Sequence, residues 1–492
     1  MKTFSFRHLL LIAGGIIGLA LLALPVSAQE ANKVQELQRV IDAQKRENVA
    51  QQKQLEAQQK QLDAQRQLLQ DLQKQMESLV KDAEPKKEIV AAEKPPAKPP
   101  EEPDKPLSEA GATLSQDFRH DRVSPTGSNF TFVDPAITLK VPNTNTTIGL
   151  HGFAEFQVIH DTNGLDNNEF DTIDIPVDGS PSQTKFSVNP SRFAISSQTS
   201  TQVGRFNTML SMDFNGELDS PEPRLRTAWG EWINDELDYS FLAGQAFATM
   251  LDLRAVPETL DFAGPTGAFA RRQPLARFSK LFGRTVLAEV AAETPENVSY
   301  INADELTRWP DFVAAGTWLF GSKFDHLRLA GLLRDLRAEG PNGSKDSTLG
   351  WAIAGSGKLG LPFLGPRDSF KLAVQYGEGY GAQIKSGPDD AAFNLGSSEL
   401  ETIGVFSTYA GLQHWWANSV RSNLVYGYLD ADNPGFIDGD ELENTTYLAA
   451  NLVWNPYKKI TLGFEYLWGR RENKDGASGT NNRFLFSSRF DY

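Results

Sequence analysis

The sequence predicts an all-β transmembrane barrel of sixteen antiparallel strands, preceded by an N-terminal α-helical coiled coil. Three features predict this fold: a seven-residue apolar repeat near the N-terminus, a two-residue alternation from residue 147 onward, and connections of alternating length. The mean hydropathy of −0.38 excludes a membrane protein built from many helices, because each spanning helix needs about 20 consecutive apolar residues.

Composition narrows the possible function classes. The 492 residues include 48 Lys and Arg, 63 Asp and Glu, and no Cys. Without Cys the chain has no disulfide scaffold, no Cys-ligated metal and no thiol nucleophile. The formal net charge of −15 argues against general nucleic-acid binding, which depends on Lys and Arg neutralising phosphates.

Residues 1–28 have the features of an export signal peptide. Lys2 and Arg7 precede an apolar run over residues 9–24, and small residues lead to a predicted cleavage site after Ala28. An uncleaved membrane anchor is the alternative, which is disfavoured because the run is shorter than a membrane span. The mature chain is therefore expected outside the cytoplasm.

Residues 29–83 are predicted to form a coiled-coil stalk without Pro or Gly. A helix this polar needs a partner helix in water, and we favour three strands, although the seam does not decide their number. A solvated helix or a disordered Gln-rich spacer is the alternative. The seam residues are Val34, Ile41, Asn48, Leu55, Leu62, Leu69 and Met76 at one position, and Leu37, Gln44, Gln51, Gln58, Gln65, Leu72 and Leu79 at the other.

Residues 84–146 are predicted to form a Pro-rich linker and a pre-barrel segment. Seven Pro lie between Pro85 and Pro106 among Lys and Glu side chains. This composition cannot bury a core and favours extended polyproline geometry, so we expect a semi-rigid spacer.

Residues 147–492 are predicted to form the barrel. Apolar and polar or small side chains alternate along each segment, as at Phe370, Leu372 and Val374. Each segment is long enough to cross a bilayer at a tilt, for which about 9–11 residues suffice. The predicted strands span 147–160, 186–199, 204–215, 224–234, 238–248, 268–279, 283–294, 310–321, 325–337, 348–360, 367–379, 400–413, 419–430, 444–455, 459–471 and 482–492.

The connections alternate in length, as in outer-membrane barrels. Short turns follow even-numbered strands. Because the strand count is even, both ends of the barrel lie on the short-turn side. The coiled coil is therefore expected in the periplasm of a Gram-negative bacterium. A soluble β-sandwich or propeller is the alternative, but it would turn its apolar residues inward. The aromatic last strand, ending at Tyr492, resembles the signal that the barrel-assembly machinery recognises. Long connections span 161–185, 249–267, 295–309, 380–399, 431–443 and 472–481.

The strand face opposite the apolar one is predicted to line the channel. This alternation directs more basic than acidic side chains inward, and Arg or Lys rings favour anions. For any single residue the alternative is an ion pair that only holds the wall together. The predicted pore-lining residues are Arg192, Arg205, Arg224, Arg226, Arg271, Arg277, Arg328, Arg334, Lys358, Lys371 and Arg421, with Arg471, Arg483 and Arg489 of the same alternation.

The connection after the fifth predicted strand is the third on the long-loop side, and we call it the third long loop. It is more apolar between Thr249 and Pro265 than an exposed loop should be. We therefore expect it to fold into the barrel, where it would narrow a sixteen-stranded lumen. Arg254, Glu258 and Asp261 are the candidate constriction residues.

Four short segments resemble the DcaP-like outer-membrane porin family: Leu242 to Gln245, Pro257 to Phe262, Arg272 to Pro274, and Arg224 to Arg226. The resemblance covers nearly the whole mature chain. It implies a homotrimeric channel with a periplasmic coiled coil that takes up small anionic solutes, dicarboxylates in particular.

An acidic loop resembles a calcium-binding loop. Asp430, Asp432, Asp438 and Glu441 match ligand positions of an EF-hand, but Pro434 stands where an oxygen ligand is expected and strands flank the loop. The segment is therefore interpreted either as a possible Ca²⁺-binding loop or as an ordinary exposed acidic loop. Acidic outer loops could also bridge through divalent cations to lipopolysaccharide. No other cofactor is expected.

The sequence thus favours a trimeric outer-membrane porin for passive diffusion of small anionic solutes, and not an enzyme. Its six His are scattered and no Ser-His-Asp grouping stands out. The alternative is a structural outer-membrane anchor whose coiled coil tethers to peptidoglycan or an envelope protein. Deleting residues 29–106 would separate the two, since a porin would keep conducting.

Overall fold

The computed structural model describes residues 137–492, except 217–220, 235, 284, 296–297, 307 and 321–324. The predicted signal peptide, coiled coil and most of the linker lie outside the described residues. Within the described part of the chain, no helix is long and apolar enough to cross a membrane.

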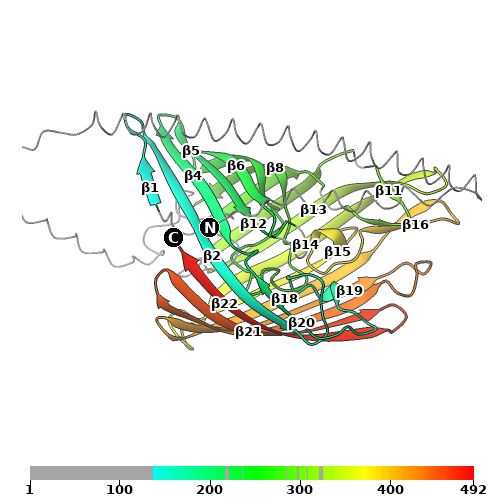
Figure 1. Ribbon diagram of the computed structural model, residues 1–492. Coiled ribbons are helices and arrows are strands. Elements are labelled where there is room, and N and C mark those ends of the chain that lie inside the picture. Colours follow the sequence, from blue (N-terminus) through cyan, green and yellow to red (C-terminus); the bar gives the residue numbers. More distant parts are fainter. Residues whose placement is uncertain are drawn as a thin grey trace, which may run out of the picture. The chain divides into compact units, whose positions relative to one another are not determined.

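Sixteen long antiparallel strands of the described residues form one closed barrel, which confirms the predicted count (Figure 1). The last strand, β22, pairs with the first, β2, between Asp491 and Phe153, and this pairing closes the barrel. The barrel strands are β2 (Thr146–Asp161), β4 (Arg192–Thr201), β5 (Gly204–Asp213), β6 (Arg224–Asn234), β7 (Tyr239–Phe247), β8 (Arg272–Phe282), β9 (Val286–Glu293), β12 (Asp311–Phe320), β13 (Asp325–Glu339), β14 (Lys345–Gly360), β15 (Ser369–Glu378), β18 (Gly404–Ala417), β19 (Val420–Asp432), β20 (Leu442–Tyr457), β21 (Ile460–Asn473) and β22 (Ser478–Asp491).

Side chains alternate between the inside and the outside of the barrel. In β12, Phe312 and Trp318 are exposed, whereas Val313 and Ala315 between them are buried. Large apolar side chains are exposed in the same way around the barrel. An apolar outer face is what a strand needs in order to contact lipid.

Two predicted strands are interrupted in the structure. The predicted strand 186–199 is divided into β3 (Gln183–Ser187) and β4, and both pieces pair with β2. Pro190 lies in the gap, where it cannot donate a ladder hydrogen bond. The predicted strand 400–413 is divided at Ile403, whose backbone bonds instead to Asp390 and Gly379.

Shorter strands extend the sheet or decorate its loops. β1 (Ile137–Lys140) pairs with the start of β2, so sheet structure begins inside the predicted pre-barrel segment. β11 (Asp304–Glu305) pairs with the end of β13. β10 (Tyr300–Ile301), β16 (Ala391–Asn394) and β17 (Glu399–Thr402) form a separate small sheet in the long loops. The 3-10 helices are η2 (Thr172–Asp174) and η3 (Gly381–Gln383).

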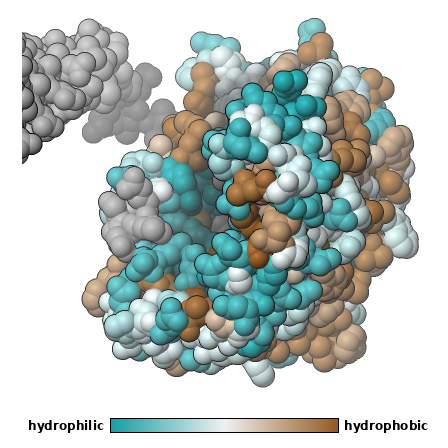
Figure 2. Space-filling model, turned by 90° about the vertical axis from the view of Figure 1, so that its right-hand side faces the viewer, coloured by the Kyte–Doolittle hydropathy of each residue, from teal (hydrophilic) through white to brown (hydrophobic). Residues whose placement is uncertain are grey.

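Three long loops turn into the barrel. They are the first long loop (residues 162–182), the third long loop (248–271) and the loop between β15 and β18 (379–403). Fully buried side chains such as Phe170, Val256 and Ile384 come from these loops and pack with inward wall residues. Figure 2 shows the end of the molecule that carries the long loops, where a hollow is rimmed mostly by hydrophilic residues.

Candidate functional site

The third long loop is bound to one side of the lumen, which we call the anchoring wall: the inward side chains of β13 to β21 together with Arg483 of β22. Arg421 donates to both carboxylate oxygens of Glu258, at 2.7 and 2.6 Å. Lys371 donates to the carbonyl of Val256 at 2.7 Å. Glu258 therefore holds the loop against the wall, and does not face an open passage.

The middle of the loop continues these contacts. The carboxylate of Glu465 accepts from the backbone N–H groups of Leu260 and Asp261, at 3.0 and 2.7 Å. Asn451 donates to the carbonyl of Glu258 at 3.1 Å. Because a buried carboxylate and several amides satisfy the loop backbone, the loop is fixed along its length.

Two inward glycines let the loop approach the wall closely. A Cβ at Gly411 would lie 2.5 Å from the ring of Pro257, and one at Gly463 would lie 2.4 Å from Leu260. A larger residue at Gly411 would displace the loop, whereas one at Gly463 would first displace the side chain of Leu260.

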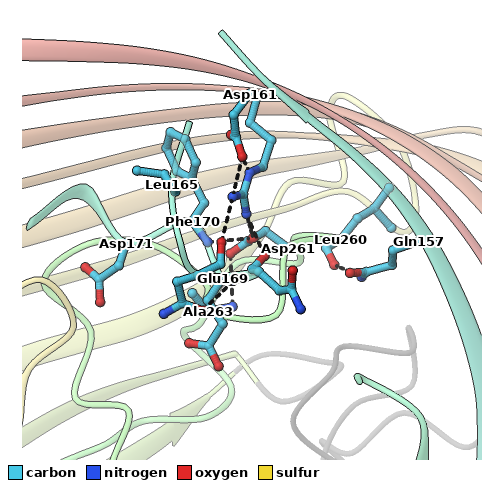
Figure 3. A network of polar contacts seen from close by, with 12 residues as sticks. Gln157, Asp161, Leu165, Glu169, Phe170, Asp171, Leu260, Asp261 and Ala263 are labelled. Carbon is cyan, nitrogen blue, oxygen red and sulfur yellow. Dashed lines mark hydrogen bonds and ion pairs between the residues drawn. The ribbon is translucent and has the colours of Figure 1, made fainter. Parts of the chain in front are cut away.

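The first long loop is joined to the third by an ionic network (Figure 3). Arg483 binds both carboxylate oxygens of Asp161, at 2.8 and 2.9 Å, and lies 3.3 Å from Asp261. Asp261 in turn accepts from the backbone N–H of Phe170 at 2.9 Å. Asp261 thus joins two loops and one strand, and its carboxylate is buried.

The beginning of the third loop is held by β13 and β14. Arg328 donates to the carbonyl of Thr249 at 2.7 Å. Asp252 accepts from His326 at 2.8 Å and from Ser356 at 2.7 Å. Arg254, the third predicted constriction residue, lines a small cavity beside these groups.

The opposite side of the third loop presents the ring of Phe262 to a second group of basic residues. The guanidinium carbons of Arg192, Arg224 and Arg226 lie 5.9, 5.6 and 5.1 Å from the centre of this ring. Arg272 and Arg489 belong to the same group, and we call these five residues the basic wall. They come from β4, β6, β8 and β22.

A β-bulge places two of these residues side by side. Met212 pairs with Leu225 and Ser211 with Thr227, so Arg226 is an extra residue in β6. Arg224 and Arg226 both bind Asp213, at 3.0 and 2.5 Å. Bulges commonly redirect side chains at functional sites, and regular alternation could not have indicated this one.

Arg272 and Arg489 extend the basic wall in both directions. Arg272 lies 5.5 Å from the ring of Phe247 and is an electrostatic neighbour of Arg224 and Arg226. Arg489 lies 3.8 Å from the ring of Phe153 and 2.8 Å from Asp491. The alternation rule assigned Arg271 to the lumen and missed Arg272, because the first residue of β8 does not follow the strand alternation.

The other predicted pore-lining residues have structural partners or lie apart from the basic wall. Arg277 and Arg328 both bind Glu289, at 3.8 and 2.5 Å, while Arg334 binds Asp311 and Asp390 at 3.0 Å each. Arg271 donates to the carbonyl of Ala382 at 2.9 Å. Arg205 and Lys358 are half-buried. Arg471 donates to the carbonyl of Ile173 at 2.6 Å.

The residues proposed for calcium binding are not gathered around one point. Asp430 and Asp432 are exposed on the outer face of β19, Asp438 is exposed, and Glu441 is half-buried. No group of three or more His, Asp or Glu suited to a metal occurs among the described residues. The ammonium of Lys474 instead binds the loop carbonyls of Pro434 and Ile437, each at 2.9 Å. Calcium binding stays a prediction from sequence.

The fold and the sequence were compared with known proteins. A sequence model of the family described as DcaP outer membrane protein matches residues 139–492. The outer membrane channel DcaP of Acinetobacter baumannii has a crystal structure that is 20% identical, with a TM-score of 0.65, 72% of this chain covered and 99% of that one. An anion-selective porin from Comamonas acidovorans is 10% identical, with a TM-score of 0.51 and coverages of 70% and 100%. No curated protein matches this chain.

The family match covers more than half of the chain and agrees with the closed sixteen-stranded barrel. The family and the fold place the barrel in the outer membrane, with the architecture of a porin-like channel. This chain is a member of the DcaP outer membrane protein family.

Proposed function

We propose that this chain is a passive channel for small anionic solutes, dicarboxylates among them, and that these solutes move along the basic wall. The observation that carries the proposal is a group of five neighbouring guanidinium groups, three of which lie 5.1 to 5.9 Å from the centre of the Phe262 ring. The third loop narrows the lumen from the other side and would set the size limit.

The charge balance of the basic wall favours anions. Among the described residues, its five guanidinium groups outnumber their four carboxylate neighbours, Asp213, Glu155, Asp491 and Glu169. Lumen walls of low dielectric concentrate the field of such charges and raise the local concentration of counter-ions. Phe262 adds an apolar surface that neutralises none of the positive charge.

We also propose that the channel is a homotrimer. The heptad seam predicted for residues 29–83 supports an oligomer. On the outer face, small side chains at Ser197, Thr208, Gly230 and Ala243 are cross-strand neighbours and form a flat surface. The hydroxyl groups of Ser197 and Thr208 bond to each other at 2.7 Å, and a protein neighbour would shield them from lipid.

The test is ion selectivity in planar bilayers. The full-length protein should give a reversal potential that favours Cl⁻ in a KCl gradient, with conductance steps in threes if the trimer forms. Changing Arg224 and Arg226 together to Ala should reduce the permeability ratio of Cl⁻ to K⁺ about threefold to tenfold, because the local potential falls.

A matched control removes two positive charges from the outer face. Arg337 and Arg470 lie on that face at the long-loop ends of β13 and β21, and each is partly exposed beside an acidic residue. The double change to Ala should leave selectivity unaltered. A clear K⁺ preference in the unmodified protein, or equal selectivity in both double variants, would refute the anion pathway.

A further inference from the structure

Lys385 occupies a fixed position between the long loops and the basic wall. It lies in loop 379–403, and its backbone bonds to the third loop in both directions. Gly267 donates to the carbonyl of Lys385 at 2.9 Å, and Lys385 donates to the carbonyl of Ala268 at 2.9 Å. The backbone of Lys385 is therefore held against the third loop.

Two carboxylates of the first long loop bind this ammonium group. Glu169 lies 2.9 Å from the Nζ atom of Lys385, and Asp171 lies 2.8 Å from it. The second oxygen of Glu169 accepts from the amide of Asn215, and the second oxygen of Asp171 accepts from the hydroxyl of Ser386. Every oxygen of the two carboxylates thus has a donor.

The group is electrostatically suited to carboxylates. Burial alone would raise the pKa of Glu169 and of Asp171, but the Lys385 ammonium outweighs burial and holds both pKa values below their usual range. Arg271 adds a further positive neighbour to both carboxylates. Both groups therefore stay ionised at neutral pH.

The group adjoins the basic wall at its long-loop end. Glu169 is an electrostatic neighbour of Arg224, Arg226 and Arg272. Asn215 lies two residues after Asp213, which both bulge arginines bind. A solute that enters from the long-loop end would meet Lys385 before it meets the guanidinium groups.

Exchange at this position needs side-chain rotation and no movement of the loop. The neighbouring residues Phe170 and Thr172 are fully buried, and the hydroxyl of Thr172 bonds to that of Thr266 at 2.7 Å. Glu169 keeps 15% of its side chain exposed and has three rotatable side-chain bonds. Its carboxylate can leave Lys385 while the loop stays in place.

We propose that Lys385, Asn215, Ser386 and Arg271 form an outer carboxylate-binding site, which Glu169 and Asp171 occupy when no solute is present. An entering carboxylate displaces Glu169, binds Lys385 and then passes to the basic wall. The proposal rests on the proposed anion channel, because it supplies that pathway with an entry site. Glu169 acts as a built-in competitor that sets how much solute is needed for occupancy.

The experiment measures block of Cl⁻ current by succinate in planar bilayers containing the full-length protein. Glu169→Gln removes the competing charge, so succinate should block at about tenfold lower concentration, the equivalent of one charge-assisted hydrogen bond. Asp166→Asn is the matched control, since Asp166 is an exposed acid of the same loop whose side chain is outside this group. It should leave the blocking concentration unchanged.

A second variant tests whether the gain in succinate sensitivity depends on Lys385. Adding Lys385→Gln to Glu169→Gln should abolish the gain in succinate sensitivity, while heat-resistant migration on gels confirms a folded barrel. An unchanged blocking concentration in Glu169→Gln, or a gain that survives loss of Lys385, would overturn the outer site. If instead Arg224 and Arg226 can be removed without altering selectivity, the anion channel itself fails.

Discussion

The two walls of the lumen carry similar basic residues with different roles. On the anchoring wall, Arg421 and Arg483 bind acids that the long loops bring to them. On the basic wall, Arg192 and Arg226 face an aromatic ring of the same third loop. The third loop therefore supplies a carboxylate to the arginines of one wall and an aromatic ring to those of the other, where Arg224 and Arg226 share the single carboxylate of Asp213.

The third loop itself produces this difference. It directs Asp252, Glu258 and Asp261 towards the anchoring wall, and it directs Phe262 towards the basic wall. A carboxylate pairs with a guanidinium and removes its field from the lumen, whereas an aromatic face attracts the cation but leaves its charge in place. One loop thus separates a wall whose arginines it pairs with its own carboxylates from a wall whose arginines outnumber the carboxylates beside them.

The strongest test of this comparison is to release the loop. Glu258→Gln keeps the size of the side chain but leaves the buried guanidinium of Arg421 without its counter-charge, which costs about 3–5 kcal/mol. We expect the loop to detach, single-channel conductance to rise and the thermal stability of the folded barrel to fall. Glu399→Gln, at an exposed acid on the long-loop side, should change neither.

Conductance separates this outcome from simple unfolding. A detached loop gives larger open-channel currents in barrels that still migrate as folded on gels. A variant with unaltered conductance and stability would show that Glu258 is not needed to hold the loop, and would contradict the assigned role of the anchoring wall.

The stability of the barrel should depend on pH through Asp261, which joins the first and third long loops. Burial raises the pKa of Asp261 from its usual value near 3.8 to about 6. Because the folded chain then binds more protons than the unfolded chain between about pH 4 and 6, stability should fall as pH rises through that window. The full difference corresponds to about 3 kcal/mol, at 1.36 kcal/mol for each pKa unit.

The measurement is urea unfolding of the barrel in lipid vesicles at pH 4.5 and pH 7.5. Asp261→Asn should remove most of the difference between the two pH values, because an amide does not titrate there. Equal pH dependence in the variant and the unmodified chain would contradict the raised pKa.

The barrel was predictable because its signals are local. Alternation along each strand and the length of each connection are read from neighbouring residues, and they give all sixteen strands. Local reading failed at Pro190, which splits a strand; it directed Arg226 inward correctly, but it did not show the bulge that this residue forms.

The site was predictable only in outline. Alternation directs Arg192 and Arg421 to the lumen alike. It cannot show that the side chain of Glu258, which is 163 positions before Arg421 in the sequence, reaches Arg421 through a folded loop. The grouping of Lys385 with Glu169 joins residues 216 positions apart. Such pairings depend on how loops pack inside the barrel, and no single segment contains that information.

The subtlest test adds one methyl group to the anchoring wall. Gly411→Ala places a Cβ 2.5 Å from the ring of Pro257, so the loop must shift towards the basic wall, at about 1–3 kcal/mol. We expect a smaller single-channel current with the anion preference preserved, because the passage narrows while its charges remain. Gly316→Ala is the matched control, since a Cβ there meets no atom within 4 Å. Equal currents in both variants would show that the loop does not border the passage, and the division into two walls would then lose its functional meaning.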